Sequence, residues 1–253
     1  MKKKLVIKIG TSTLTAGTNR ISFAVIESLA RQIVSLKEDF DVVIVSSGAV
    51  ATARQLVEIN GYCGEVDSKQ ALAAIGQTKL MEIYDNIFSS FGLNIAQILM
   101  TYRDFENATA KENTRNTIKK LWEVGYIPIV NENDTVAVEE IVLGDNDKLS
   151  ALVSVIIDAS LLILVSDIDG IFTRNPHLCA DAELIEEVSD ISSISCCVEE
   201  KKSKLGTGGM SSKIHAADIC MNHNIEMWIV NGQRADYILK ALNNEIPFTK
   251  FKQ

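Results

Sequence analysis

Short apolar runs alternate with segments of helical periodicity along most of this chain. The runs place valine, isoleucine and leucine at consecutive positions, which is typical of strands that are buried on both faces. Between them, apolar residues recur every three or four positions, which predicts amphipathic helices. The predicted strands are 5–10, 41–48, 94–101, 126–131, 161–166 and 225–230, and the predicted helices are 22–37, 68–88, 110–124, 148–159 and 214–220.

This alternation predicts an α/β sandwich around a mostly parallel sheet, because parallel strands need crossover connections. Residues 136–144 alternate more regularly and are compatible with a hairpin. The length of 253 residues allows one or two domains. No repeat, low-complexity tract or Pro/Gly-rich linker divides the chain, and we interpret the Ser-, Cys-, Lys- and Gly-rich patch at 191–208 as a mobile loop. We therefore expect a single domain over residues 1–253.

The composition excludes several classes of protein. With 47% apolar and 23% charged residues, the chain is neither disordered nor collagen-like. Residues 1–130 carry 15 basic and 13 acidic side chains, whereas residues 131–253 carry 10 and 20. Because no basic surplus or stripe is present, we expect no nucleic-acid partner. Any anionic ligand must then be met by a few well-placed cations.

The cysteines and the N-terminal segment indicate the compartment. Five cysteines, an odd number without a C-x-x-C pair, indicate free thiols in a reducing environment. The first apolar run is interrupted by Lys8 and Gly10, too early for a signal peptide. No stretch approaches the ~20 apolar residues of a membrane span. We expect a soluble, cytoplasmic protein without a membrane partner.

Unusual residues gather where the first predicted strands end, which is where open parallel sheets bind ligands. Lys8 stands inside an apolar strand, where an ammonium group is costly unless it reaches water or an anion. A lysine that simply extends to water is the alternative. After the second strand, the turn at 46–49 (Ser-Ser-Gly-Ala) offers N–H groups and hydroxyls to an anion, although an ordinary helix cap looks similar.

Two polar clusters, at 131–135 and 144–147, mix carboxylates with amides. Ordinary turn and cap chemistry, with Asp147 as a helix N-cap, is the alternative to a binding site. Two such clusters so close together favour a polar site. The pair Asp167 and Asp169 is compatible with metal or acid–base chemistry, but Asp169 precedes a glycine, and we interpret it as a turn residue.

The most specific motif is the segment 205–213, in which three glycines precede a predicted helix. It is neither a Walker A loop nor a complete G-x-G-x-x-G fingerprint. The glycines still allow the backbone to approach a phosphate, the helix N-terminus adds partial positive charge, and Lys213 adds a full charge. A purely flexible loop is the alternative. His215, Cys220 and His223 lack a zinc-site spacing, so we predict no metal site there.

Six segments together resemble the glutamate 5-kinase family of the amino acid kinase superfamily, in order and over nearly the whole chain. They are LVIKIGTSTLT (5–15), VVIVSSGAVA (42–51), SKQALAAIGQ (68–77), NENDTVAVEEIVLGDNDKLSALV (131–153), SDIDGIFTRNP (166–176) and GTGGMSSKIHAAD (206–218). The resemblance implies a three-layer α/β/α sandwich with a central, mostly parallel sheet. It also implies ATP-dependent phosphorylation of the side-chain carboxylate of L-glutamate, the first step of proline biosynthesis.

The resemblance also implies roles for individual residues. Lys8 and Lys213 resemble the two phosphate-binding lysines and Asp147 the carboxylate that orients them, and these three form the predicted catalytic set. The predicted glutamate-binding residues are Ser47, Gly48, Asp134 and Asn146. The predicted ATP-binding residues are Lys8, Ser166, Asp167, Thr207, Gly208, Gly209, Met210, Ser211, Ser212 and Lys213, with Mg²⁺ bridging the phosphates.

Many members of the family carry a further C-terminal PUA domain. This chain ends about twenty residues after its last predicted strand, so we expect a form without that domain. The resemblance also implies a homo-oligomer and feedback inhibition by proline at the glutamate site. The role of the pair Cys196-Cys197 stays open.

Two other interpretations stay open. A superfamily enzyme that acts on acetylglutamate, aspartate or carbamate would share the fold, and the clusters at 131–134 and 144–147 argue against it only through resemblance. A non-catalytic amino-acid sensor would keep the fold, but binding alone would not require Lys8, Lys213 and Asp147 together.

Overall fold

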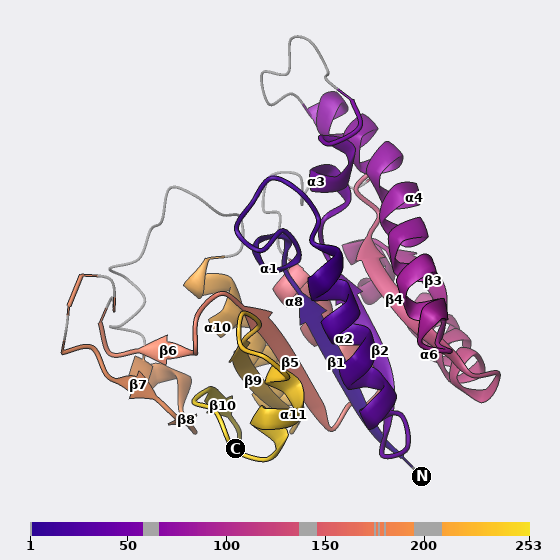
Figure 1. Cartoon of the computed structure of the whole chain (residues 1–253). Helices are drawn as coiled ribbons and strands as arrows, with labels where there is room; N and C mark the ends of the chain where they lie inside the picture. The colour runs from indigo at the N-terminus through magenta and orange to yellow at the C-terminus, as the bar shows by residue number, and fades with distance from the viewer. Residues whose placement is uncertain are drawn as a thin grey trace.

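The computed structural model describes residues 2–57, 66–136, 146–174, 176, 178–179, 181–194 and 209–253. Within these residues, eight strands form one sheet in the order β3-β4-β2-β1-β5-β9-β10-β8 (Figure 1). The strands are β1 (Lys3–Ile9), β2 (Phe40–Ser46), β3 (Asn94–Met100), β4 (Tyr126–Glu132), β5 (Leu161–Ser166), β8 (Glu187–Val188), β9 (Glu226–Asn231) and β10 (Thr249–Phe251). Two short strands, β6 (Ile171–Phe172) and β7 (Leu184–Ile185), form a separate antiparallel pair.

The strand order changes direction at β1. The six neighbouring strands from β3 to β9 run parallel, and β10 then pairs antiparallel with β9. After β1 the chain builds β2, β3 and β4 on one side, and only then adds β5 on the other side of β1. In open α/β sheets, ligands bind beyond the carboxyl ends of the strands at such a point.

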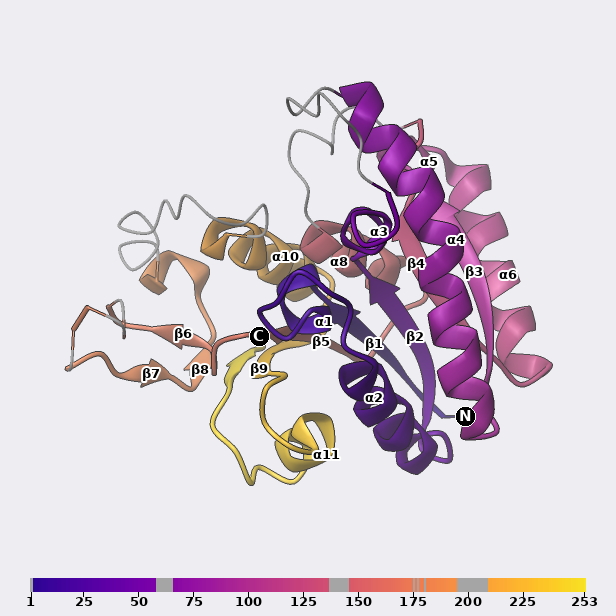
Figure 2. The same ribbon diagram turned by 45° about the horizontal axis from the view of Figure 1, so that its top comes forward.

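Helices cover both faces of the sheet (Figure 2). One face packs against α2 (Phe23–Leu36), α4 (Val66–Ser90) and α11 (Tyr237–Leu242), and the other against α6 (Ala108–Glu123), α8 (Asn146–Ile156) and α10 (Met210–Asn222). The shorter helices are α1 (Thr11–Leu14), α3 (Ala49–Ala53), α5 (Tyr102–Glu106) and the 3-10 helix η1 (Ile191–Ile194). The predicted three-layer α/β/α sandwich with a mostly parallel sheet is therefore confirmed.

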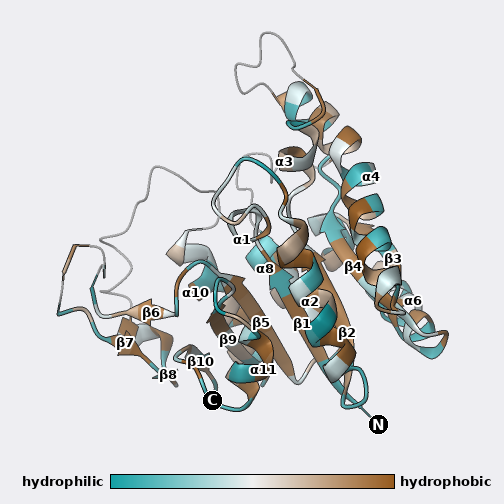
Figure 3. Ribbon diagram, viewed as in Figure 1, coloured by the Kyte–Doolittle hydropathy of each residue, from teal (hydrophilic) through white to brown (hydrophobic). Residues whose placement is uncertain are grey.

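Successive side chains of β1 enter two different cores. Leu5, Ile7 and Ile9 pack with residues of α2 and α4, while Val6 packs with residues of α8 and α10. All four are fully buried, and Figure 3 shows the same concentration of apolar residues on the central strands. A strand covered on both sides needs apolar residues at consecutive positions, which is the pattern that the sequence shows. By the same alternation Lys8 points to the face that α8 and α10 cover.

The six predicted strands and five predicted helices are confirmed, with ends that differ by a few residues. The short helices α1, α3 and α5 and the short strands were not predicted, because two to five residues carry no detectable periodicity. The hairpin interpretation at 136–144 falls almost wholly outside the described residues, as do positions 195–208 of the predicted loop. Its first residues, Ile191–Ile194, form η1. In the part of the chain that is described, no helix has the length and apolarity needed to cross a bilayer.

Candidate active site

The carboxylate of Asp147 lies between two lysine ammonium groups. Its Oδ1 is 2.5 Å from Lys8 Nζ, and its Oδ2 is 2.9 Å from Lys213 Nζ. Asp147 is fully buried, and the two lysines are only 6% and 8% exposed. Three charges buried together must compensate one another, because a single unpaired ion in the interior is very costly. We call these three residues the lysine bridge.

Three separate elements, β1, α8 and α10 (Figure 2), supply the residues of the lysine bridge. Lys8 is the next-to-last residue of β1, and Asp147 lies in the first turn of α8, where the helix dipole favours a negative charge. Lys213 is the fourth residue of α10. A Cβ at position 10 would lie 3.3 Å from Lys8 Nζ, so the absence of a side chain at Gly10 leaves space for that ammonium group.

The charges of the lysine bridge decide the protonation state of its carboxylate. Burial by itself would raise the pKa of Asp147, but the nearby charges of Lys8 and Lys213 outweigh this effect. The pKa of Asp147 is therefore held well below its ordinary value. Ser212 Oγ donates a further hydrogen bond of 3.2 Å to Asp147 Oδ2. The lysine bridge thus holds two cations and one anion.

Asn146, directly before Asp147, belongs to a second group of polar side chains. Its Nδ2 donates to Ser47 Oγ at 3.0 Å and to Asn131 Oδ1 at 2.9 Å. The Nδ2 of Asn131 in turn donates to Gln77 Oε1 at 2.8 Å. These four residues, the amide chain, connect the ends of β2 and β4 with α4 and α8. The structure therefore brings Ser47 and Asn146, two predicted glutamate-binding residues, into direct contact.

The other two predicted glutamate-binding residues lie at the same strand ends. Gly48 has a φ of +105°, a conformation that favours glycine, and it turns the chain from Ser47 into α3. Asp134 follows β4 and is partly buried. Its pKa is raised from 3.8 to about 6, because burial penalises the ionised form. No described side chain donates a hydrogen bond to this carboxylate.

The predicted ATP-binding residues fall into three groups. Ser212 and Lys213 touch Asp147, and Gly209, Met210 and Ser211 form the start of α10. Ser166 ends β5 and donates to Asp167 Oδ1 at 3.2 Å, and no hydrogen bond among the described residues joins this pair to the lysine bridge. Thr207 and Gly208 lie outside the described residues.

The interpretation of Asp169 as a structural residue agrees with its contacts. Its two carboxylate oxygens accept from Arg234 at 2.7 and 2.9 Å, and Oδ1 also accepts from Asn231 Nδ2 at 3.0 Å. These bonds tie the turn after β5 to the end of β9. By contrast, the alternative of Asp147 as a helix N-cap is wrong, because Asp147 stands inside α8 and its side chain contacts the two lysines.

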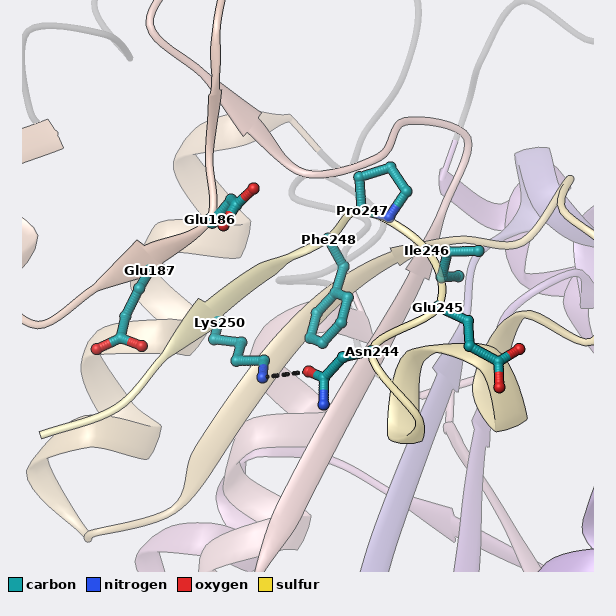
Figure 4. Close-up of a pocket in the computed structure, with 8 residues that line it drawn as sticks. All are labelled: Glu186, Glu187, Asn244, Glu245, Ile246, Pro247, Phe248 and Lys250. Atoms are coloured by element: carbon teal, nitrogen blue, oxygen red, sulfur yellow. Dashed lines mark hydrogen bonds between the residues drawn. The ribbon is translucent and has the colours of Figure 1, made fainter.

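A surface pocket of about 440 Å³ lies apart from these residues, around the loop before β10 (Figure 4). Glu186, Glu187 and Glu245 line it, and its one lysine, Lys250, donates to Asn244 Oδ1 at 2.7 Å. Three carboxylates would repel a phosphate, so this pocket does not suit a nucleotide. None of the predicted site residues lines it.

The sequence did not identify Gln77 as a site residue, and it indicated Asn131 only as one member of the polar cluster at 131–135. A signal for Gln77 was nevertheless present. Counting by helical turns, Gln77 stands on the same stripe of α4 as the buried residues Ala73, Leu80 and Tyr84. An amide on an apolar stripe needs a polar partner, and that partner is Asn131.

Known proteins share both the sequence and the fold. The profile of the amino acid kinase family matches residues 3–231. The glutamate 5-kinase of Dehalococcoides mccartyi is 43% identical over 98% of this chain and 68% of its own length. That of Alkaliphilus oremlandii is 43% identical over 98% of this chain and 95% of its own length, and that of Listeria innocua is 41% identical over 98% and 92%.

Among solved structures, the UMP kinase of Ureaplasma parvum superposes with a TM-score of 0.69 at 16% identity, covering 100% of both chains. At that identity the likeness shows the fold alone. Fold and family profile together define an amino acid kinase. The chain belongs to the amino acid kinase family and, within it, to the glutamate 5-kinases.

The first prediction concerns the charge of Asp147. Asp147→Asn keeps the shape but leaves two buried ammonium groups without an anion, so we expect the free energy of unfolding at pH 7 to fall by about 3 kcal/mol. The depressed pKa of Asp147 means that its stabilisation is present above the ordinary aspartate pKa and is lost as the pH falls through the depressed value. Urea unfolding at pH 7 and at pH 2, below the ordinary aspartate pKa, measures this, and equal stability of both proteins at pH 7 would contradict it.

The second prediction concerns Asp134, whose replacement should stabilise the folded protein instead of destabilising it. Because its folded-state pKa is raised to about 6, the ionised carboxylate destabilises the fold above that pH. We expect Asp134→Asn to raise the free energy of unfolding at pH 8 by about 3 kcal/mol. The gain should shrink between pH 6 and pH 4, where the wild-type side chain is protonated in the folded state. A variant that is less stable than the wild type at pH 8 would contradict a raised pKa of Asp134.

Proposed function

We propose that this chain phosphorylates the side-chain carboxylate of L-glutamate with ATP, giving L-glutamyl 5-phosphate for proline biosynthesis. One observation carries the proposal: the buried Asp147 contacts two lysines at the carboxyl edge of the sheet, next to the amide chain. The two ammonium groups are suited to binding phosphate oxygens. The amide side chains are suited to hydrogen bonding with the charged groups of an amino acid. The family relationship with glutamate 5-kinases supports the choice of acceptor.

The reaction needs cations more than it needs a base. The side chain of glutamate has an ordinary pKa of about 4.3, so it is already ionised at pH 7 and can attack without losing a proton. The obstacle is that one anion must approach another, the γ-phosphate of ATP. Lys8 and Lys213 would contact phosphate oxygens and stabilise the charge on the phosphoryl group during transfer. Backbone N–H groups at the start of α10 would add hydrogen bonds.

Asp147 has a supporting part in this scheme. Its two oxygens contact the two ammonium groups, which holds both of them against one carboxylate before substrate arrives. Cations that are already in place need little reorganisation when charge shifts in the transition state. We therefore assign Asp147 to orienting the lysines.

Mg²⁺ bound to ATP would neutralise phosphate charge, as it does in kinases generally. Both oxygens of Asp147 contact lysines, and the described residues contain no group of three His, Cys, Asp or Glu side chains that could hold a metal. This donor set fits a metal carried by the phosphates, and no residue of this chain is assigned to it.

Several wider expectations belong to the same proposal. We propose that residues 1–253 act as one amino acid kinase domain, which the single eight-stranded sheet supports. We also propose that this domain acts in the cytoplasm. Homo-oligomer formation and inhibition by proline stay predictions.

The proposed function predicts one acceptor specificity. Purified protein with ATP, Mg²⁺ and L-glutamate should consume ATP and yield an acyl phosphate that hydroxylamine traps as a hydroxamate. N-acetylglutamate, aspartate and carbamate should give little product. Turnover on one of these acids would assign the chain to another amino acid kinase activity. Glutamate binding without turnover would favour the sensor interpretation.

The lysines give a separate prediction. Lys8→Met and Lys213→Met should each lower kcat a hundredfold or more, since one lost charge at a phosphoryl group costs on the order of 3 kcal/mol of transition-state stabilisation. The matched control is Lys79→Met, which removes an exposed lysine paired with Glu82 on α4. It should leave kcat unchanged. Near-normal turnover in either buried-lysine variant would remove that lysine from the mechanism.

A further inference from the structure

Each hydrogen bond of the amide chain has a defined direction: Asn146 donates to Ser47 on one side and to Asn131 on the other, and Asn131 donates to Gln77. At its centre, Asn131 Oδ1 accepts from two donors, the backbone N–H of Glu132 and Asn146 Nδ2, each at 2.9 Å. Asn131 Nδ2 donates to Gln77 Oε1, and Asn146 Nδ2 donates to Ser47 Oγ as well. The three amide side chains are therefore orientated relative to one another.

A backbone group fixes this direction. The N–H of Glu132 can only donate, so it must meet the oxygen of Asn131 and never its nitrogen. The nitrogen of Asn131 then has to face Gln77, which must present its oxygen. Asn146 must likewise turn its nitrogen toward Asn131. Only one arrangement of the three amides satisfies all these contacts.

That arrangement decides which atoms are left for a ligand. Asn146 has turned its nitrogen inward, and so its carbonyl Oδ1 is left as an acceptor. Ser47 accepts at its oxygen, and so its hydroxyl hydrogen is left as a donor. Among the described residues, neither of these groups has another partner. An acceptor beside a donor matches the ammonium and the carboxylate that every α-amino acid carries together.

Only one of the two polar groups of the Gln77 side chain, its carbonyl oxygen, has a hydrogen-bond partner. Gln77 is 8% exposed, and its Nε2 is buried without a hydrogen-bond partner. An apolar side chain of similar size would fill the same space without burying an unpaired N–H group. A Cβ at the neighbouring Gly76 would collide with the carbonyl of Ala49, so α4 lies directly against α3 at this point. The packing is tight, and Oε1 is the one polar atom of Gln77 that is used.

We propose that Gln77 is a positioning residue that sets the specificity of this site for an α-amino acid. Its oxygen holds Asn131, Asn131 holds Asn146, and Asn146 therefore presents a carbonyl oxygen to the substrate ammonium group. Gln77 acts through the amide chain without touching the substrate. The inference rests on the proposed function in one respect: the amino acid tested is glutamate.

The test removes the acceptor while keeping the size of the side chain. Gln77→Met should raise the KM for glutamate about tenfold and leave the KM for ATP within twofold. Glutarate lacks the α-ammonium group, so the preference for glutamate over glutarate, measured as a ratio of kcat/KM values, should fall about tenfold. Calorimetric binding of both acids without ATP should show the same change in Kd, and this readout does not depend on turnover.

Two further variants separate positioning from general stability. Gln32→Met is the matched control, because Gln32 is a fully buried glutamine bonded to Ser28 and Ile238 on α2 and α11. It should lower Tm and leave the preference for glutamate unchanged. Gln77→Glu keeps an acceptor oxygen for Asn131 and should keep the preference at or above the wild-type value, also where Gln77→Met folds poorly.

The outcomes distinguish this proposal from the proposed function. Unchanged preference in Gln77→Met, or a loss of preference in Gln77→Glu as large as in Gln77→Met, would overturn the role of the amide chain. A wild-type protein that binds glutamate more tightly than glutarate but does not phosphorylate it would overturn the proposed function. Gln77 would then still be tested by the binding measurements. A wild-type protein with no preference between the two acids would overturn the inference directly.

Discussion

The buried contact of Asp147 with Lys8 and Lys213 is the interaction on which the rest of the site depends. None of these three charges would be tolerated alone at that depth, because each would lose its hydration without compensation. Together they tie the central strand to two helices that are distant in sequence. The contact thus has two consequences. It joins α8 and α10 to the end of β1, and it keeps two cations next to each other.

The peptide Asn146-Asp147 joins this charged group to a neutral one. Asp147 faces the lysines, and Asn146 faces Asn131 and Ser47. The first turn of α8 therefore separates a region suited to phosphate from a region suited to an amino acid. A transfer between two anionic partners needs this division, since the cations must lie at the phosphoryl group while neutral donors and acceptors orient the substrate. Any shift of α8 would move both groups at once.

Most of the regular structure was predictable, and the reasons are specific. The central strands β1, β2 and β5 contain continuous apolar runs, because helices cover both faces of the sheet, whereas the edge strand β3 is more exposed. Lys8 was recognisable as a candidate because a charge interrupts such a run. The short strands β8 and β10 were not predictable, since two or three residues have no period and their pairing is set by distant neighbours. Gln77 was missed for a related reason: its partner Asn131 is 54 positions away.

By itself, the sequence determined the alternation of strands and helices, the two buried faces of the sheet and the family. These properties follow from local spacing and from the order of motifs. The family resemblance implied that Asp147 orients the two lysines, but only the tertiary structure showed that its carboxylate contacts both of them, 139 and 66 positions away, and that one backbone N–H orients three amides. Hydrophobic periodicity records which face of an element is buried. It carries no information about which polar atoms meet across elements, because those distances are set by how helices and strands pack together.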